Sequence, residues 1–368
     1  MHENVQTVEK AIVIAVGKKS SDREAVFEQL DELENLVNTA GAEVIEKIYQ
    51  ELDSPNPATA IGRGKVEELK QLIEDEKIQL VVFDDELSPS QIKNLNSELQ
   101  VKIMDRSSLI LDIFSKHAKT VEAKTQVELA QYQYLLPRLS KMWTHLSKQY
   151  GGVGTKGPGE TQIETDRRVI RRRIKQLKEK LEQISVQRKE QQKRRSAITR
   201  FALVGYTNAG KSFLMNLLTK ANVLVEDKLF ATLDTTVRSY RFESGRKILI
   251  SDTVGFIRKL PAHLIASFRS TLSEALESDL LLHLVDVSHP QFRDHIAAVN
   301  ETLKQLKILD KETILILNKI DLLEDPSILK SLKKEFPGSV AISAKRGINI
   351  SKLLEIMESK AKSNTDNY

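Results

Sequence analysis

The chain of 368 residues contains no cysteine, which excludes disulfide bonds, thiolate metal sites and thiol catalysis. Aromatic residues make up only 5% of it and carry no RNA-recognition signature, so we do not expect single-stranded RNA to be read by base stacking. No apolar run approaches the ~18 residues that a membrane span requires. The first nine residues also lack signal-peptide features. The sequence therefore predicts a cytoplasmic protein without a membrane span.

Positive charge is concentrated in one segment. The net charge of the whole chain is +5, yet Arg167–Arg195 alone carries thirteen Lys and Arg residues against three Asp and Glu residues. The remainder of the chain is therefore acidic on balance. Such local basicity favours a polyanionic partner. We expect RNA and not DNA, and we expect a monomer.

One short segment fits the phosphate-binding pattern G-x-x-x-x-G-K-S/T in full. It follows the strand-like run Phe201–Val204 and reads Gly205-Tyr206-Thr207-Asn208-Ala209-Gly210-Lys211-Ser212. The glycines let backbone N–H groups surround a polyphosphate, and Lys211 can reach the terminal phosphates as a catalytic cation. Ser212 can offer its hydroxyl to Mg²⁺. A Gly-rich surface turn can match this pattern by chance, so the other motifs of the chain are decisive.

A second motif follows the strand-like run Lys247–Ser251 and reads Asp252-Thr253-Val254-Gly255. Asp252 would hold Mg²⁺ through a water, and the Gly255 N–H would sense the γ-phosphate during catalysis. The next residue is Phe256, where Ras-like enzymes place the glutamine that orients the attacking water. A phenyl ring cannot orient water. We therefore expect slow hydrolysis until another group, a cation or a partner supplies this function.

Two further motifs indicate guanine as the base. After the strand-like run Thr313–Leu317 come Asn318-Lys319-Ile320-Asp321, and after Val340–Ile342 come Ser343-Ala344-Lys345. The two Asp321 oxygens can accept from guanine N1–H and the 2-amino group, while the Lys319 stem covers the base. The Ala344 N–H can donate to guanine O6. Four motifs in this order within about 140 residues predict a Ras-like P-loop domain that binds GTP and GDP and hydrolyses GTP to GDP and phosphate.

The loop Leu229–Arg238 lies between the first two motifs and should contain the switch I threonine. We expect Thr236 to be the catalytic ligand of Mg²⁺ and the γ-phosphate. Thr235 is the alternative, because sequence alone does not separate two neighbouring threonines.

The amino-terminal part alternates strand-like and helical patterns. The strand-like runs are Ala11–Val16, Glu43–Ile48, Gln79–Phe83 and Val101–Met104, and helical patterns begin near residues 21, 64 and 88. This alternation predicts an α/β domain with a parallel sheet. Gly62–Lys65 is either a tight turn that caps a helix or a contact for a nucleotide or rRNA phosphate. Binding of ATP at this turn stays open.

Two amphipathic helices are expected in the middle of the chain. Apolar residues recur at alternating spacings of three and four, at Leu129, Tyr132, Leu136, Leu139, Trp143 and Leu146 and again at Ile170, Ile174, Leu177, Leu181 and Ile184. Five of the fifteen glycines fall between them in 151–159, which predicts an antiparallel hairpin with a Gly-rich tip. Pro137 should kink the first arm. The tip is either a flexible connector or an rRNA contact.

The chain resembles the HflX family of translational GTPases, within the Obg/HflX group, over nearly its whole length. The likeness lies in Phe230-Ala231-Thr232-Leu233-Asp234, in Asp252–Phe256, in Met142–Ser147 and in Gly157–Gln162. The resemblance implies that Phe230 and Thr232 also belong to the nucleotide site. It further implies that Asn208 is a candidate K⁺ ligand, although an Asn that stabilises its own turn is the alternative.

These observations predict four parts: an N-terminal parallel-sheet α/β domain (1–115), an antiparallel helical hairpin (116–196), a G domain (197–362) and a disordered tail (363–368). The family resemblance implies a factor that binds the large ribosomal subunit and its rRNA and splits or rescues stalled or idle ribosomes under stress. Two alternatives are an RNA-binding or remodelling GTPase that does not act on ribosomes, and an adaptor that regulates a membrane protease.

Overall fold

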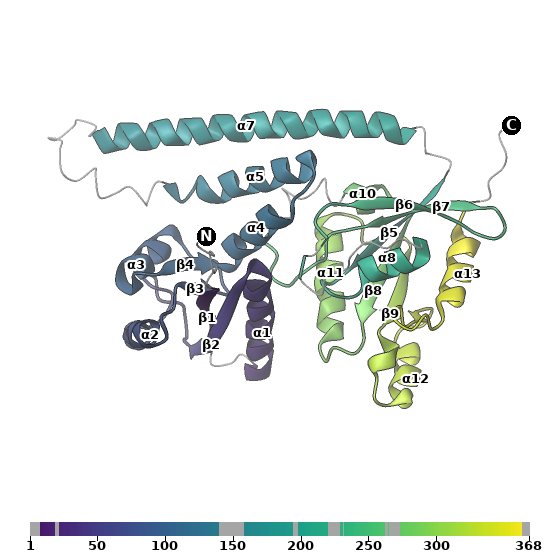
Figure 1. The fold of residues 1–368 in the computed structure, drawn as a ribbon, viewed down its shortest axis with the longest axis horizontal. Coiled ribbons are helices and arrows are strands. Elements are labelled where there is room, and N and C mark those ends of the chain that lie inside the picture. Colours follow the sequence, from purple (N-terminus) through teal and green to yellow (C-terminus); the bar gives the residue numbers. More distant parts are fainter. Residues whose placement is uncertain are drawn as a thin grey trace, which may run out of the picture. The chain divides into compact units, whose positions relative to one another are not determined.

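The computed structural model describes residues 8–18, 22–139, 158–193, 198–219, 229–230, 232–261, 264 and 273–362 (Figure 1). The chain divides into two compact units. One comprises Met1–Lys116 and Val127–Glu179, and the other comprises His117–Gln126 and Lys180–Tyr368. The predicted hairpin segment 116–196 is therefore shared between the two units. The predicted tail 363–368 lies outside the described residues.

The first unit contains a parallel four-stranded sheet in the order β2-β1-β3-β4. Its strands are β1 (Glu9–Gly17), β2 (Ala42–Glu51), β3 (Leu80–Phe83) and β4 (Lys102–Asp105). The helices that alternate with them are α1 (Arg23–Ala40), α2 (Arg63–Glu76), α3 (Pro89–Leu99) and α4 (Arg106–His117). Ile12 and Ile14 of β1 pack with apolar residues of α2 and α3 in one core cluster. The predicted α/β alternation is confirmed.

Local hydrogen bonds explain where these helices begin. Ser88 and Gln91 form a reciprocal capping box at the start of α3, which satisfies two backbone donors. Gly62 is the N-cap of α2, and its N–H donates to the Gln50 side chain at 2.9 Å. Lys65 lies inside α2 and pairs with Glu68 at 2.6 Å. These contacts belong to a turn that caps a helix, and an anion contact at Gly62–Lys65 stays a prediction.

The two arms of the predicted hairpin are α5 (Val121–Leu135) and α7 (Pro158–Lys193). Their apolar seam includes the buried side chains of Leu129, Leu139, Ile170 and Leu177. Arg173 of α7 donates to Glu128 of α5 at 2.8 Å. The helix α5 ends two residues before Pro137, which lies in the turn 136–138 before helix resumes at Leu139, so the proline interrupts the first arm. This is consistent with the exclusion of proline from helix interiors.

The predicted glycine tip is only partly described. Residues 151–157 lie outside the described residues, as do Trp143 and Leu146 of the apolar series. The last two residues of the predicted tip, Pro158 and Gly159, already belong to α7. Proline is well tolerated in the first turn of a helix because the N–H there has no helical partner.

A buried carboxylate ties the end of α5 to the first sheet. Asp105, at the end of β4, is fully buried and accepts from the Tyr134 hydroxyl at 2.8 Å. It also accepts from Arg138 at 3.2 Å and from the Ser108 N–H at 2.8 Å. Burial, followed by the negative charge of Asp105, raises the pKa of the Tyr134 phenol. Tyr134 therefore stays a hydrogen-bond donor at neutral pH.

The second unit contains a six-stranded sheet in the order β10-β9-β8-β5-β7-β6. All neighbours are parallel except β6 and β7. The strands are β5 (Thr199–Gly205), β6 (Thr236–Arg241), β7 (Lys247–Asp252), β8 (Leu280–Asp286), β9 (Thr313–Asn318) and β10 (Val340–Ala341). The helices are α8 (Lys211–Thr219), α10 (Ser273–Glu277), α11 (Phe292–Gln305), α12 (Pro326–Glu335) and α13 (Ile350–Lys360). This mixed α/β architecture is that of a P-loop GTPase domain, as predicted.

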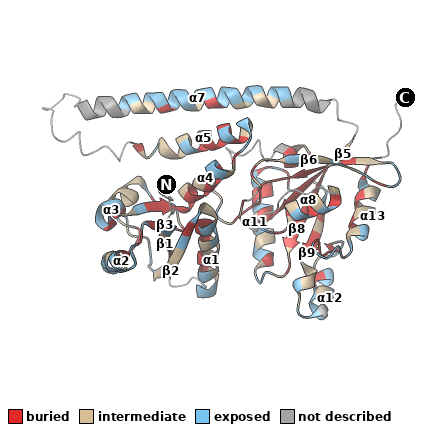
Figure 2. Cartoon of the chain, in the orientation of Figure 1, coloured by how far each residue is buried: buried red, intermediate tan, exposed pale blue. Residues whose placement is uncertain are grey.

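Two apolar clusters lie against this sheet. One joins the strands to α8 and α13, through residues such as Leu214 and Met357. The other joins them to α11 and α12, through Phe292 and Leu332. The central strands are accordingly the most buried part of the unit (Figure 2). Within the described residues, no helix is both long and apolar enough to cross a membrane.

Candidate active site

The predicted P-loop connects β5 to α8 and closely approaches two other strands. A Cβ at Gly205 would lie 2.3 Å from the Leu284 carbonyl oxygen, and one at Gly210 would lie 2.6 Å from the Asn318 side-chain nitrogen. Both glycines also have positive φ angles, +151° and +94°. Only glycine meets both demands. The loop is therefore held at the carboxyl ends of the parallel strands, where such sheets bind ligands.

Lys211 is the buried cation of this loop. Its ammonium group donates to the carbonyl oxygens of Gly205 and Tyr206, at 3.1 Å and 2.8 Å. Burial lowers the pKa of Lys211 to about 8, and the nearby Asp252 carboxylate opposes this shift. A buried ammonium ion with so little opposing charge favours the arrival of an anion. This is the electrostatic character expected of a polyphosphate site.

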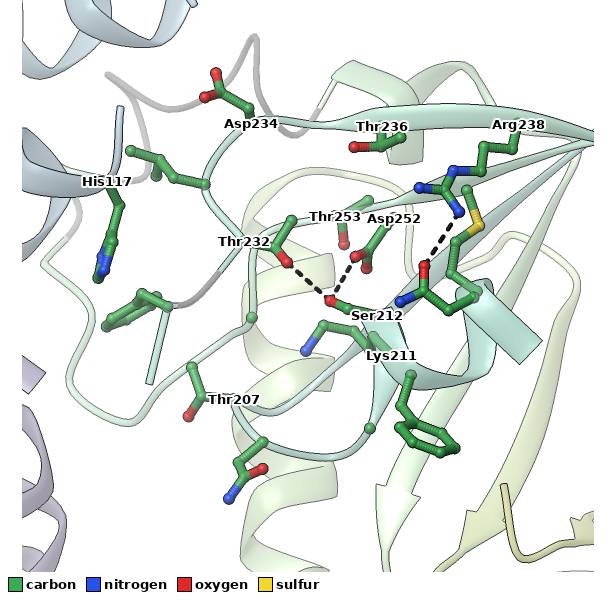
Figure 3. A pocket seen from close by; sticks show the side chains of 18 of the residues that line it. His117, Thr207, Lys211, Ser212, Thr232, Asp234, Thr236, Arg238, Asp252 and Thr253 are labelled. Atoms are coloured by element: carbon green, nitrogen blue, oxygen red, sulfur yellow. Dashed lines mark hydrogen bonds between the residues drawn. The ribbon is translucent and has the colours of Figure 1, made fainter. Parts of the chain in front are cut away.

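Ser212, Thr232 and Asp252 form a compact cluster of oxygen atoms beside Lys211 (Figure 3). The Ser212 hydroxyl lies 2.8 Å from the Thr232 hydroxyl and donates to one Asp252 oxygen at 2.6 Å. The other oxygen, Asp252 Oδ1, is buried without a hydrogen-bond partner in the described part of the chain. Burial raises the pKa of Asp252, while the bond from Ser212 lowers it. Two hydroxyls beside a carboxylate that has one unpaired oxygen form a donor set that suits a hydrated Mg²⁺ ion.

The threonine that the structure brings to this cluster is Thr232, and the metal-ligand role of Thr236 stays a prediction. Thr236 opens β6 and is exposed, and its backbone is paired with that of Asp252. Thr235 precedes this strand. Thr232 is the threonine that contacts Ser212. The prediction followed the spacing of the loop alone, whereas the family resemblance had already pointed to Thr232 as a nucleotide-site residue.

The segment after Asp252 lies against the P-loop. A Cβ at Gly255 would lie 2.7 Å from the Thr207 side chain and 3.1 Å from the Lys211 ammonium. Thr207 N–H donates to the Phe256 carbonyl at 2.7 Å, and Phe256 N–H donates to the Gly205 carbonyl at 3.1 Å. The Phe256 side chain is only 1% exposed. It is therefore part of the core and does not replace a water-orienting glutamine.

Several predicted nucleotide residues offer only their backbone to this site. The Tyr206 ring stacks on His295 with centroids 3.8 Å apart, and its hydroxyl accepts from the Arg258 N–H. The Thr253 hydroxyl donates to the Leu203 carbonyl at 2.6 Å. Ala209 and Val254 are buried as well. Asn208 has a positive φ of 61°, a conformation that asparagine tolerates well in turns.

The two predicted guanine motifs meet through Asn318. Its side-chain nitrogen donates to the Ala209 carbonyl at 2.9 Å, and its oxygen accepts from the Ala344 N–H at 3.1 Å. Asn318 therefore joins the P-loop to the Ser343–Lys345 loop. The Lys319 ammonium lies 2.6 Å from Asp286. A hydrogen bond from Ser343 lowers the pKa of Asp321, which keeps this carboxylate ionised as an acceptor.

A cavity of 390 Å³ opens at the phosphate side of the site (Figure 3). Its lining includes the P-loop and the cluster just described, together with Phe230, Asp234 and Arg238 of the loop and strand that follow. The residues of the two guanine motifs do not line it. His117 and Lys119 do, although they lie far away in sequence. No sequence signal marked these two residues, because their proximity comes from the tertiary fold.

Comparison with known proteins covers almost the whole chain. Residues 27–115 match the family described as GTP-binding GTPase N-terminal. Residues 117–195 match the GTP-binding GTPase Middle Region, and residues 200–319 match the 50S ribosome-binding GTPase family. In the crystal structure of a complex of SsGBP with GDP, the protein is 27% identical, with a TM-score of 0.53. The match covers 96% of this chain and 98% of that one.

Individual relatives carry a common name. The GTPase HflX of Flavobacterium psychrophilum is 55% identical over 313 residues, which cover 85% of this chain and 76% of that protein. The GTPase HflX of Escherichia coli is 42% identical over 335 residues, with coverages of 90% and 78%. The chain therefore belongs to the HflX family of GTPases, which bind and hydrolyse GTP.

Proposed function

We propose that this GTPase acts on the large ribosomal subunit and, in its GTP-bound state, splits or rescues stalled or idle ribosomes. The observation that carries the proposal is the match of residues 200–319 to the 50S ribosome-binding GTPase family. A second observation is the basic arm α7, which is largely exposed (Figure 2). Its exposed residues include Arg168, Arg171 and Arg172. Exposed arginines on one helix supply the salt-dependent attraction that an RNA backbone requires.

In the proposed reaction the P-loop amides and Lys211 hold the β- and γ-phosphates, while Asp321 and Ala344 select guanine. Ser212 and Thr232 would hold Mg²⁺ directly, with Asp252 acting through a water. When bound, this ion neutralises charge on the phosphate oxygens. The Gly255 N–H would donate to the γ-phosphate. Thr232 takes the role that the sequence had given to Thr236.

Phe256 is buried and offers no polar group in place of the missing glutamine. Its proposed replacements are a K⁺ ion held near Asn208 and the ordering of the switch loops by the ribosome. Either would aid the reaction by fixing charge and geometry around the attacking water. The glycine tip of the hairpin is proposed to contact rRNA, but residues 151–157 lie outside the described residues.

Sucrose-gradient sedimentation tests the ribosomal proposal. The protein is mixed with ribosomal subunits and either GDP or a non-hydrolysable GTP analogue. We expect co-migration with the large subunit in the presence of the analogue only. Free protein in both states would contradict the proposal and favour a GTPase that remodels other RNA or an adaptor of a membrane protease.

A charge-matched pair of variants locates the contact. Replacing Arg168, Arg171 and Arg172 by Gln leaves Arg173 in its ion pair with Glu128. This triple variant should lose the co-migration at a lower salt concentration than the unchanged protein. The control replaces three exposed lysines of α12 by Gln: Lys330, Lys333 and Lys334. Equal losses in the two variants would mean that α7 makes no specific contact.

A further inference from the structure

The switch I residue Asp234 makes contacts that GTP binding does not explain. Its carboxylate accepts from the Lys119 N–H at 2.8 Å, from the Thr120 N–H at 3.3 Å and from the Thr120 hydroxyl. The Thr120 hydroxyl in turn accepts from the Ala123 N–H at 3.1 Å. Because α5 begins at Val121, Thr120 is its N-cap, and the Asp234 carboxylate binds the two residues just before the helix. Asp234 therefore holds the N-cap residue of α5 from a distant part of the chain.

The same short segment also reaches the oxygen cluster of the active site. Thr232 stands two residues before Asp234, and its hydroxyl lies 2.8 Å from that of Ser212. Leu233 between them is 1% exposed and so is fixed in the core. Switch I is thus anchored on both sides of Leu233, by the active site on one side and by α5 on the other. Figure 3 shows Thr232 and Asp234 on the same stretch of chain.

The charge of Asp234 also indicates that this residue anchors switch I to α5. This carboxylate lines the cavity that receives a polyanion, and a free carboxylate there would repel the phosphates. Three donor groups engage both of its oxygens, with further support from the positive end of the α5 helix dipole. Asp252, by contrast, keeps one oxygen without a partner in the described part of the chain. Asp252 is therefore the carboxylate that would accept from a water on Mg²⁺, and Asp234 remains committed to the residues at the start of α5.

We infer that Asp234 is a positioning residue for GTP hydrolysis: by binding Lys119 and Thr120 at the start of α5, it holds Thr232 in place to ligate Mg²⁺. The inference rests on the proposed role of Thr232 as a magnesium ligand. It also implies reciprocity, because a contact that favours Mg²⁺ and GTP must itself be favoured by them. The same helix α5 continues to Leu135 and carries Glu128, which pairs with Arg173 of α7.

The test compares two Asp→Asn substitutions of matched chemistry. In Asp234→Asn, one of the two engaged oxygens becomes an amino group that faces a donor. Asp325 is the N-cap of α12 and likewise has both oxygens engaged, by the N–H and the hydroxyl of Ser327, so Asp325→Asn is the control. The measurement is the Mg²⁺ concentration that gives half-maximal GTP hydrolysis by the isolated full-length protein, with GDP affinity and melting temperature measured in parallel.

We expect Asp234→Asn to raise the half-saturating Mg²⁺ concentration by about tenfold or more, the loss of one charge-assisted hydrogen bond. GDP affinity should change by less than about twofold, because the P-loop and base contacts persist. Thr120→Val should raise the half-saturating Mg²⁺ concentration by a similar factor, whereas Thr120→Ser, which keeps the hydroxyl, should leave it close to that of the unchanged protein. The double variant Asp234→Asn with Thr120→Val should need no more Mg²⁺ than the more affected single variant. Asp325→Asn should leave the Mg²⁺ dependence unchanged.

Two outcomes would overturn the inference. One is an unchanged Mg²⁺ dependence in Asp234→Asn, or a change no larger than in Asp325→Asn. The other is full additivity of Asp234→Asn and Thr120→Val. Thr232→Ala separates this failure from a failure of the proposed metal site. If Thr232→Ala also leaves the Mg²⁺ dependence unchanged, the magnesium role of Thr232 is wrong and the inference falls with it.

Discussion

The depressed pKa of Lys211 predicts that GTP binding takes up a proton. In the nucleotide-free protein, burial lowers the pKa of this lysine from 10.5 to about 8. A bound triphosphate places several negative charges against the ammonium group and so raises its pKa again. Binding must therefore protonate the fraction of Lys211 that is neutral beforehand. Above pH 8 the phosphates of the nucleotide are already ionised, so this proton belongs to the protein.

The number of protons taken up on GTP binding equals the fraction of Lys211 that is neutral before binding. About half of the Lys211 side chains are neutral at pH 8, so binding should take up about 0.5 proton there and about 0.9 proton at pH 9. The Kd for GTP should be nearly constant below pH 7 and should rise toward about tenfold per pH unit above pH 8.

The stability of the nucleotide-free protein should follow the same lysine. Its folded-state pKa of about 8 lies below the unfolded value of 10.5, so the unfolded chain binds more protons between these values. The contribution of Lys211 to the free energy of unfolding should therefore rise with pH through this window, by up to about 3 kcal/mol. Below pH 8 the full penalty of the buried charge applies.

Isothermal titration calorimetry at pH 8 and pH 9, in two buffers of different ionisation enthalpy, measures the proton uptake directly. Lys211→Arg is the control, because arginine stays protonated at these pH values and should show no uptake. If the unchanged protein takes up no proton at pH 9, Lys211 is fully charged before binding. The argument from its burial would then be wrong.

Three further predictions concern the base, the cation and the partner. Asp321→Asn should weaken GTP binding by about 1 to 3 kcal/mol, because a guanine donor then faces an amide donor, and it should improve binding of xanthosine triphosphate. Competition binding with the two nucleotides checks this, and an unchanged preference for GTP would refute it. GTP hydrolysis should be faster in K⁺ than in Na⁺, and Asn208→Ala should narrow the difference. Equal steady-state rates in both salts would exclude such a cation site. Large ribosomal subunits should raise the hydrolysis rate at least about tenfold, which corresponds to lowering the activation free energy by about 1.4 kcal/mol. If the isolated protein hydrolyses GTP fast and ribosomal subunits do not change the rate, the ribosome does not supply the function of the missing glutamine.

The elements of both sheets could be predicted because their signals are local. Runs such as Phe201–Val204 and Ile314–Leu317 are apolar at consecutive positions, the pattern of strands buried on both faces of a parallel sheet. The structure places them in β5 and β9. The end of α5 before Pro137 was less predictable. Apolar spacing continues through Leu136 and Leu139, whereas the backbone follows the proline.

The residues of the phosphate site also differ in whether a local sequence signal marks them. Gly205, Gly210 and Lys211 could be assigned from sequence because their tasks depend on a few adjacent residues. The switch I threonine could not, because several threonines occur within a few residues and only the fold decides which of them reaches Ser212. The approach of His117 and Lys119 to the cavity leaves no local pattern at all, since it depends on where α4 ends and α5 begins.

Helix α5 is held near each end by a carboxylate, and the two attachments differ in strength. Asp105 is fully buried and accepts from Tyr134 and Arg138. Breaking a buried charge pair of this kind typically costs about 3 to 5 kcal/mol. Asp234 is only partly buried, so water can replace its donors at a lower cost. When the nucleotide state changes, the contact of α5 with switch I should therefore break first, while the contact with β4 persists. Of the two contacts of α5, we therefore expect the one with Asp234, and not the one with Asp105, to respond to GTP.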